Sequence, residues 1–212
     1  MLNALFPQVD WSRVEAVGFD LDGTLYDEYD FIDQVYQRLI EEALPAHAQS
    51  RTGRWMRLRW LAKGSSYPHI FTEAAQLAGL SEKEIEPFVA RALSIYRTFE
   101  PALALPPRVR ALLEVAAHQW PIFLVTDGNA ALQRRKATAL GLDRWIDPAR
   151  MVFTGALPPG SAKPSAAAFG HLPDISPDRS VFFGDRECDA GFARESGCQF
   201  VAVAQMMPRK DG

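Results

Sequence analysis

Several features that mark other classes of protein are scarce in this sequence of 212 residues. It has only two cysteines, Cys188 and Cys198, which are too few for a disulfide framework and have no metal-ligand neighbours. No segment has the roughly 18 consecutive apolar residues that a membrane span requires. Residues 1–11 lack a basic segment and a long apolar run, so we expect no signal peptide. These absences favour a reducing cytoplasm and argue against a membrane partner.

An excess of charge of one sign is also missing. Basic and acidic residues number 23 and 26, which gives a formal net charge of −3, and the two signs are mixed along the chain. Nucleic-acid-binding proteins usually carry a basic patch, so we expect no nucleic-acid partner. At this length, 48% hydrophobic residues can build a substantial core. Whether the protein is a monomer or a homodimer stays open.

An acidic turn follows the first apolar segment. Residues 14–19 are apolar enough for a strand that is buried on both faces. Asp20 and Asp22 end it, and Gly23 permits a sharp turn. Residues i and i+2 of a strand point to the same side, so the two carboxylates should lie close together. Crowded like charges require a cation or a proton.

The next part of the chain has a purely helical pattern. Apolar residues at helical spacing predict four helices, near residues 28–43, 51–61, 70–77 and 81–96. In the second we expect Trp55 and Leu58 to face the interior, with Trp60 and Leu61 as further candidates. Ser81 and Glu84 form a capping-box pattern at the start of the fourth helix. Helices joined by short breaks suggest a small bundle.

After a proline-rich linker at residues 100–107, strands and helices alternate strictly. We expect strands at 121–125, 151–153, 180–183 and 200–203, and helices at 108–118, 130–140, 165–172 and 189–196. Such alternation implies a parallel sheet with helices on both faces. We therefore predict an α/β fold with a doubly wound parallel sheet, made of residues 1–25 and 106–212. Residues 26–105 would form a helical-bundle insert, and we expect the tail from Met206 to be frayed.

Reactive side chains follow four of the predicted strands, and ligands of such sheets bind beyond the carboxyl ends of the strands. A lone polar residue at a strand end is usually structural, but four coincident ends favour a site. The residues are Asp20 and Asp22, Thr126-Asp127-Gly128, Lys163, and Gly184-Asp185 with Asp189 one helical turn later.

These motifs, in this order, resemble the four motifs of the haloacid dehalogenase superfamily, beginning with Asp20-Leu21-Asp22-Gly23-Thr24. The resemblance covers residues 14–25 and 106–204. It implies a Rossmann-like core, and the helical insert is similar to the C1-type cap of some members. Most members are magnesium-dependent phosphatases. The dehalogenases lack an Asp two residues after the nucleophile, so Asp22 argues for phosphate chemistry.

The resemblance implies a role for each acid. Asp20 would be the nucleophile and would form an aspartyl-phosphate. Asp22 would be the general acid and then the general base. Spacing alone does not separate these two roles. Mg²⁺ would lie between Asp20, the main-chain carbonyl of Asp22, and Asp185, because a hard cation prefers oxygen ligands.

Other residues would hold the phosphate. The Thr126 hydroxyl and the N–H groups of Asp127 and Gly128 would bind its oxygens. Lys163 would offset the negative charge. Asp189 would orient Lys163 or a metal-bound water. Many relatives have Asn or Gly in place of Asp127, which matters little if only its N–H is used.

Some features depart from the family pattern or stay ambiguous. Arg186 and Glu187 are bulky and charged, which puts in doubt which acid supports the metal. The basic run from Arg51 to Arg59 is either an anion or partner surface or, as we favour, a solvated helix face. Tyr26 and Tyr29 either touch substrate or pack at the hinge of the insert.

We expect a Mg²⁺-dependent phosphomonoester hydrolase that acts on a small phosphorylated metabolite, of the sugar phosphate, phosphoglycolate or nucleotide type. One alternative is a phosphotransferase or sugar-phosphate mutase that uses the same site. Another is a non-catalytic relative that binds a phosphorylated metabolite or a protein partner.

Overall fold

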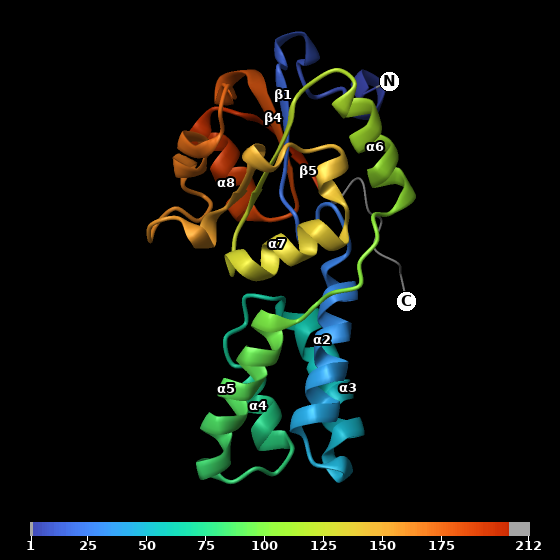
Figure 1. Cartoon of the computed structure of the whole chain (residues 1–212), viewed down its shortest axis with the longest axis vertical. Coiled ribbons are helices and arrows are strands. Elements are labelled where there is room, and N and C mark those ends of the chain that lie inside the picture. Colours follow the sequence, from blue (N-terminus) through green and yellow to red (C-terminus); the bar gives the residue numbers. More distant parts are fainter. Residues whose placement is uncertain (1, 204–212) are drawn as a thin grey trace. The chain divides into compact units, whose positions relative to one another are not determined.

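The computed structural model describes residues 2–203, which form two compact units (Figure 1). One contains the chain up to Glu28 and from Ala102 onward, and the other contains Tyr29–Pro101. These limits lie a few residues from those expected from the sequence. The expectation for the tail from Met206 concerns residues outside the described range.

The first unit is built on a five-stranded parallel sheet. The predicted α/β fold with a doubly wound parallel sheet is confirmed. The strand order β3-β2-β1-β4-β5 places β1 at the centre, with the chain winding outward in both directions. Ligands of such sheets bind at this kind of switch point. The strands are β1 (Ala16–Phe19), β2 (Ile122–Thr126), β3 (Met151–Phe153), β4 (Ser180–Gly184) and β5 (Gln199–Ala202).

The three central strands are buried along their whole length. This explains their near-continuous apolar sequences, since helices cover both faces of a parallel sheet. Gly18 lies against the Phe123 ring, and a Cβ at this position would come within 2.2 Å of that ring. Phe123 in turn stacks with Phe182, whose ring contacts Phe192 on the next helix. The close packing of these rings therefore requires a glycine in β1.

The helices of this unit are α1 (Leu2–Leu5), α6 (Pro107–Ala117), α7 (Ala130–Ala139) and α8 (Glu187–Ser196). Short 3₁₀ turns connect them: η1 (Trp11–Arg13), η2 (Leu142–Arg144), η3 (Pro148–Arg150), η4 (Thr154–Ala156), η5 (Ala166–His171) and η6 (Pro177–Arg179). The short helix expected at 165–172 is present as η5, which is a 3₁₀ helix. Pro173 follows soon after and restricts the residue before it, which leaves room only for a short connector.

The second unit consists of α2, which begins in the first unit, and three further helices (Figure 1). Their bounds are α2 (Glu28–Ala43), α3 (Ala46–Lys63), α4 (Ile70–Leu77) and α5 (Glu82–Thr98). The four predicted helices are confirmed, although α3 begins earlier than expected. The capping box at the start of α5 is also confirmed, since the Ser81 N–H donates to Glu84 Oε2 at 2.8 Å.

The predicted inner face of α3 is wrong. Leu58 and Leu61 are 57% and 62% exposed, and Trp55 and Trp60 are only half-buried. The buried residues of this helix are Ala48, Thr52, Gly53 and Met56. A Cβ at Gly53 would lie 2.6 Å from Ile40 Cδ1, so the small residues let α2 approach closely. This close approach turns the large apolar residues of α3 toward solvent.

The basic run of α3 is partly neutralised within the helical unit. Arg57 forms an ion pair with Asp33 of α2. Arg59 donates to both carboxylate oxygens of Glu73 at 2.9 Å, and to the hydroxyl of Tyr67 at 3.0 Å. These contacts favour a structural role for the run. Among the helices of residues 2–203, none is both long and apolar enough to cross a membrane.

Candidate active site

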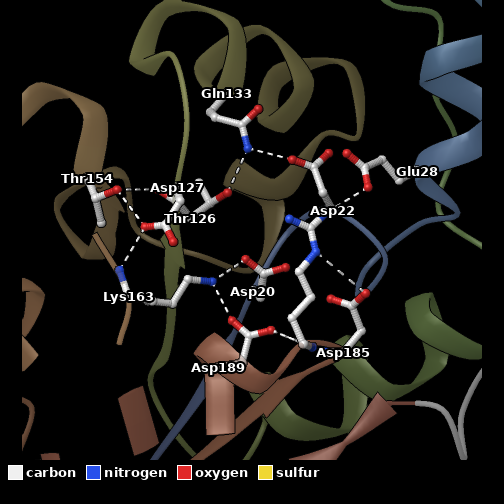
Figure 2. Close-up of polar contacts among 11 residues, drawn as sticks. Asp20, Asp22, Glu28, Thr126, Asp127, Gln133, Thr154, Lys163, Asp185 and Asp189 are labelled. Carbon is white, nitrogen blue, oxygen red and sulfur yellow. Dashed lines mark hydrogen bonds and ion pairs between the residues drawn. The ribbon is translucent and has the colours of Figure 1, made fainter. Parts of the chain in front are cut away.

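The ends of three strands bring acidic and hydroxyl side chains together (Figure 2). Phe19 of β1 is paired with Leu124 of β2 and Phe183 of β4, so these strands end side by side. Asp20 follows β1, and its N–H still donates to Phe183 O at 2.9 Å. The sheet therefore holds the backbone of Asp20 rigidly at its carboxyl edge.

Lys163 lies between two carboxylates at this edge. Its Nζ donates to Asp20 Oδ1 at 2.5 Å and to Asp189 Oδ1 at 2.6 Å, and all three side chains are buried. Burial alone would lower the pKa of Lys163, but the charges of Asp20, Asp189 and Asp127 outweigh it and raise this pKa. Lys163 is therefore an ammonium ion at neutral pH.

Burial raises the pKa of Asp20 to about 7, against the opposing effect of Lys163. The nearby charge of Asp189 raises it further. A buried carboxylate with so raised a pKa gains from any further cation beside it. A further cation bound beside Asp20 would therefore stabilise its ionised form.

Asp22 has partners that the sequence did not reveal. Lys136 Nζ donates to its Oδ1 and Gln133 Nε2 to its Oδ2, both at 2.7 Å. The hydroxyl of Tyr26 donates to Oδ1 as well, which assigns this tyrosine a contact in the site. Burial alone would raise the pKa of Asp22, but Lys136 and these hydrogen bonds lower it. The signal in the sequence was the i, i+3 spacing of Gln133 and Lys136 on the helix after Thr126.

The turn after β2 presents a hydroxyl and backbone N–H groups. Thr126 is buried, and its Oγ1 accepts from Gln133 Nε2 at 2.7 Å. Gly128 has φ 104°, a conformation that favours glycine. Asp127 also uses its side chain. Its Oδ1 accepts from Thr154 Oγ1 at 2.6 Å and from the Lys163 N–H at 3.2 Å. Asp127 therefore ties the Lys163 loop to β2.

The segment after β4 contributes two acids with different surroundings. Asp189 Oδ2 accepts the N–H groups of Asp185 at 3.1 Å and Arg186 at 2.9 Å, and its Oδ1 accepts from Lys163. Asp185 is more exposed, and partial burial raises its pKa. Arg186 Nη2 lies 2.7 Å from Glu28 Oε2. The sequence did not single out Glu28 as a residue near the site.

The acids are arranged suitably for a hard cation. Carboxylate oxygens of Asp20, Asp185 and Asp189 lie within 4.8 Å of one another. A Cβ at Gly23 would come within 2.4 Å of Asp185 Oδ2, so the turn after Asp22 closely approaches this carboxylate. Both oxygens of Asp189 already accept hydrogen bonds. Asp20 and Asp185 are therefore the carboxylates that fit Mg²⁺ best, since this ion binds one or two carboxylates and keeps several waters.

Comparison with known families agrees with this geometry. Residues 14–197 match the model of a hydrolase family described as haloacid dehalogenase-like hydrolase. No curated protein matches the chain.

Three solved structures with the same fold each share less than a quarter of their residues with this chain. A subfamily IA, variant 1 hydrolase of this superfamily from Geobacter sulfurreducens aligns with a TM-score of 0.67 at 19% identity, over 90% of this chain and 87% of that one. A protein assigned as a β-phosphoglucomutase from Thermotoga maritima aligns with a TM-score of 0.64 at 22% identity, over 89% and 85%. A predicted phosphoglycolate phosphatase from Haemophilus somnus aligns with a TM-score of 0.62 at 24% identity, over 90% and 85%.

Proposed function

The chain belongs to the haloacid dehalogenase-like hydrolases, and from this premise we propose that it is a Mg²⁺-dependent phosphomonoester hydrolase. Its substrate would be a small phosphorylated metabolite. The observation that carries the proposal is the buried contact of Lys163 with Asp20, beside a second acid, Asp22, that is separately held by hydrogen bonds. This arrangement would provide a nucleophile in Asp20, a proton donor in Asp22 and a positive charge in Lys163 at one edge of the sheet.

Asp20 would attack the phosphorus of the substrate. One carboxylate oxygen forms a bond to phosphorus while the bond to the leaving oxygen breaks, which gives an aspartyl-phosphate. Lys136 lowers the pKa of Asp22 in the free enzyme. The negative charge of the bound substrate would raise this pKa, so that Asp22 takes up a proton from water and gives it to the leaving oxygen. Asp22 would then accept a proton from the water that attacks the aspartyl-phosphate, which releases phosphate and restores Asp20. The two acids thus act in both halves of the reaction.

Other groups would hold the phosphoryl group during transfer. The Thr126 hydroxyl and the N–H groups of Asp127 and Gly128 would donate to its oxygens. Lys163, kept charged by its carboxylate neighbours, would offset the negative charge of the transferred group. Asp189 would orient Lys163, a role supported by the 2.6 Å contact between them.

Asp20, the main-chain carbonyl of Asp22, and Asp185 would hold Mg²⁺. The ion would neutralise charge on the oxygens of the phosphoryl group. Residues 26–105 would serve as a cap that limits substrate size and excludes water. The names of two structural relatives, a phosphoglycolate phosphatase and a β-phosphoglucomutase, support substrates of the phosphoglycolate or sugar phosphate type, with nucleotides as a further class. Both cysteines are free, which supports the proposed cytoplasmic setting.

The test compares wild-type protein with Asp20→Asn in the presence of Mg²⁺, first on p-nitrophenyl phosphate and then on a panel of phosphorylated metabolites. We expect phosphate release by the wild type and none by the variant. Retained turnover in Asp20→Asn would remove this residue from its role. Isomer formation without phosphate release would indicate a mutase, and no reaction across the panel would favour a non-catalytic binding protein.

A further inference from the structure

Gln133 and Lys136 are polar residues on the buried face of α7. Their exposed fractions are 3% and 1%. Residues three apart on a helix lie on the same side, so both reach in the same direction. An amide or ammonium group buried in this way costs free energy unless it is hydrogen-bonded. The contacts of these two residues therefore indicate why the helix has polar side chains on its inner face.

Both residues bind the same carboxylate, one oxygen each. Lys136 Nζ lies 2.7 Å from Asp22 Oδ1, and Gln133 Nε2 lies 2.7 Å from Asp22 Oδ2 (Figure 2 shows Gln133 and Asp22). Two donors on different oxygens restrict both the position and the rotation of a carboxylate. Asp22 lies beyond the end of β1, just before the turn at Gly23, and its backbone forms only an isolated bridge with Tyr26, whereas the Asp20 N–H still bonds to β4.

Gln133 also connects Asp22 to the phosphate-binding hydroxyl. A carboxylate only accepts hydrogen bonds, so the amide must present Nε2 to Asp22. The same Nε2 donates to Thr126 Oγ1 at 2.7 Å. Because this hydroxyl accepts from Gln133, its own proton stays available for another acceptor. The Thr126 hydroxyl can therefore donate to a phosphate oxygen while it accepts from Gln133.

We propose that Lys136 and Gln133 are positioning residues for the reaction. Lys136 holds Asp22 in the orientation needed for proton transfer. Gln133 contacts both Asp22 and the Thr126 hydroxyl, and so fixes the distance between the proton donor and the phosphate site. Neither residue touches substrate. The proposal rests on the proposed phosphatase function, because it assigns these residues through the roles of Asp22 and Thr126.

The first test replaces Lys136 by Met, which keeps the length of the side chain and removes its charge. We expect kcat to fall about 100-fold, as small displacements of catalytic groups typically cost. KM and the inhibition constant of inorganic phosphate should change less than about 3-fold, because Lys136 is assigned no contact with phosphate. Lys136→Arg should restore part of kcat. Arg134→Met, an exposed basic residue on the same helix, is the matched control and should keep wild-type rates.

A double-mutant cycle with Asp22→Asn separates positioning from general damage. If Lys136 acts through Asp22, the double variant Asp22→Asn/Lys136→Met should be no more than about 3-fold slower than Asp22→Asn alone. Multiplying losses would overturn the proposal. Circular dichroism and thermal melts of each variant check folding. If Lys136→Met does not fold, Lys136→Arg keeps the test decisive, because a loss of kcat in Arg134→Met as large as that in Lys136→Arg would also overturn the proposal.

Gln133→Met tests the second contact separately. We expect it to weaken inhibition by inorganic phosphate at least about 5-fold and to lower kcat, whereas Lys136→Met affects kcat alone. An unchanged inhibition constant in Gln133→Met would overturn the link to Thr126. The wild type distinguishes the two levels of inference. If the wild type hydrolyses a substrate but the losses of Asp22→Asn and Lys136→Met multiply, only the positioning roles fail. If the wild type hydrolyses none of the substrates, the proposed function itself is wrong.

Discussion

Lys163 Nζ and Asp189 Oδ1 lie 2.6 Å apart, and the two side chains are 2% and 1% exposed. The same ammonium group contacts Asp20 from the first strand. One lysine therefore bridges two buried acids that belong to opposite ends of the chain. Removing one partner of a buried ion pair leaves an uncompensated charge, which costs far more than the pair contributes.

Lys163→Met should therefore abolish turnover and also lower stability. We expect the free energy of unfolding at pH 7 to decrease by about 3–5 kcal/mol, measured by urea denaturation. The physical cause is repulsion between Asp20 and Asp189 in a site with little water. Lys163→Arg keeps the positive charge and is the control. Its free energy of unfolding should decrease less than that of Lys163→Met. An unfolding free energy of Lys163→Met equal to that of the wild type would show that the pair is not important for stability.

Asp185→Asn should weaken Mg²⁺ binding. The amide has no negative charge, so the Mg²⁺ concentration for half-maximal turnover should rise at least about 10-fold. The increase in melting temperature on adding MgCl₂ should shrink in parallel. Glu187→Gln is the matched control, because Glu187 is 88% exposed and lies only two residues away. Equal responses of the two variants to Mg²⁺ would exclude Asp185 as a ligand.

Glu28 and Arg186 should be energetically coupled. Their 2.7 Å contact joins the start of α2 to the start of α8, and the Glu28 side chain is nearly buried. Because the Arg186 side chain is partly exposed, we expect a coupling energy of only about 1 kcal/mol. The measurement is a double-mutant cycle with Glu28→Gln and Arg186→Met in chemical denaturation. Additive losses would mean that the ion pair does not stabilise the protein.

Glu73→Gln tests the cluster in the helical unit. Hydrogen bonds from Arg59 and Tyr67 hold the pKa of Glu73 below its ordinary value of 4.5. The folded state then binds fewer protons than the unfolded state, so this stabilisation is present above pH 4.5 and is lost as the pH falls through the folded pKa. Glu73→Gln should melt below the wild type at pH 7, and the difference should shrink as the pH falls below 4.5. Glu86→Gln, at an exposed acid of α5, is the matched control and should melt close to the wild type at pH 7.

Gly18→Ala should destabilise the sheet, because its Cβ would collide with the Phe123 ring. Overpacking of this kind costs about 1–3 kcal/mol, which thermal or urea unfolding can measure. Gly170→Ala is the matched control, since a Cβ there meets no atom within 4 Å. If both substitutions have the same effect on stability, the β1 glycine is not needed for packing.

Much of the fold was readable from the sequence because its signals are local. Buried parallel strands require continuous apolar runs, and the capping box of Ser81 and Glu84 lies within one turn. The interior face of α3 was misread because Trp55 and Leu58 look like core residues. Three of the four residues buried there are small, and only the neighbouring helix reveals that Gly53 lies against Ile40.

By itself, the sequence determined the alternation of strands and helices, the position of the insert, and the order of the acidic motifs at strand ends. These depend on hydrophobic periodicity and on the rule that parallel strands present their carboxyl ends at one edge. Only the tertiary structure decided which side chains hold those acids. Lys136 and Gln133 are 114 and 111 residues from Asp22 along the chain, and a hydrogen bond between such distant residues exists only after the sheet has placed β1 beside the strand that leads into α7.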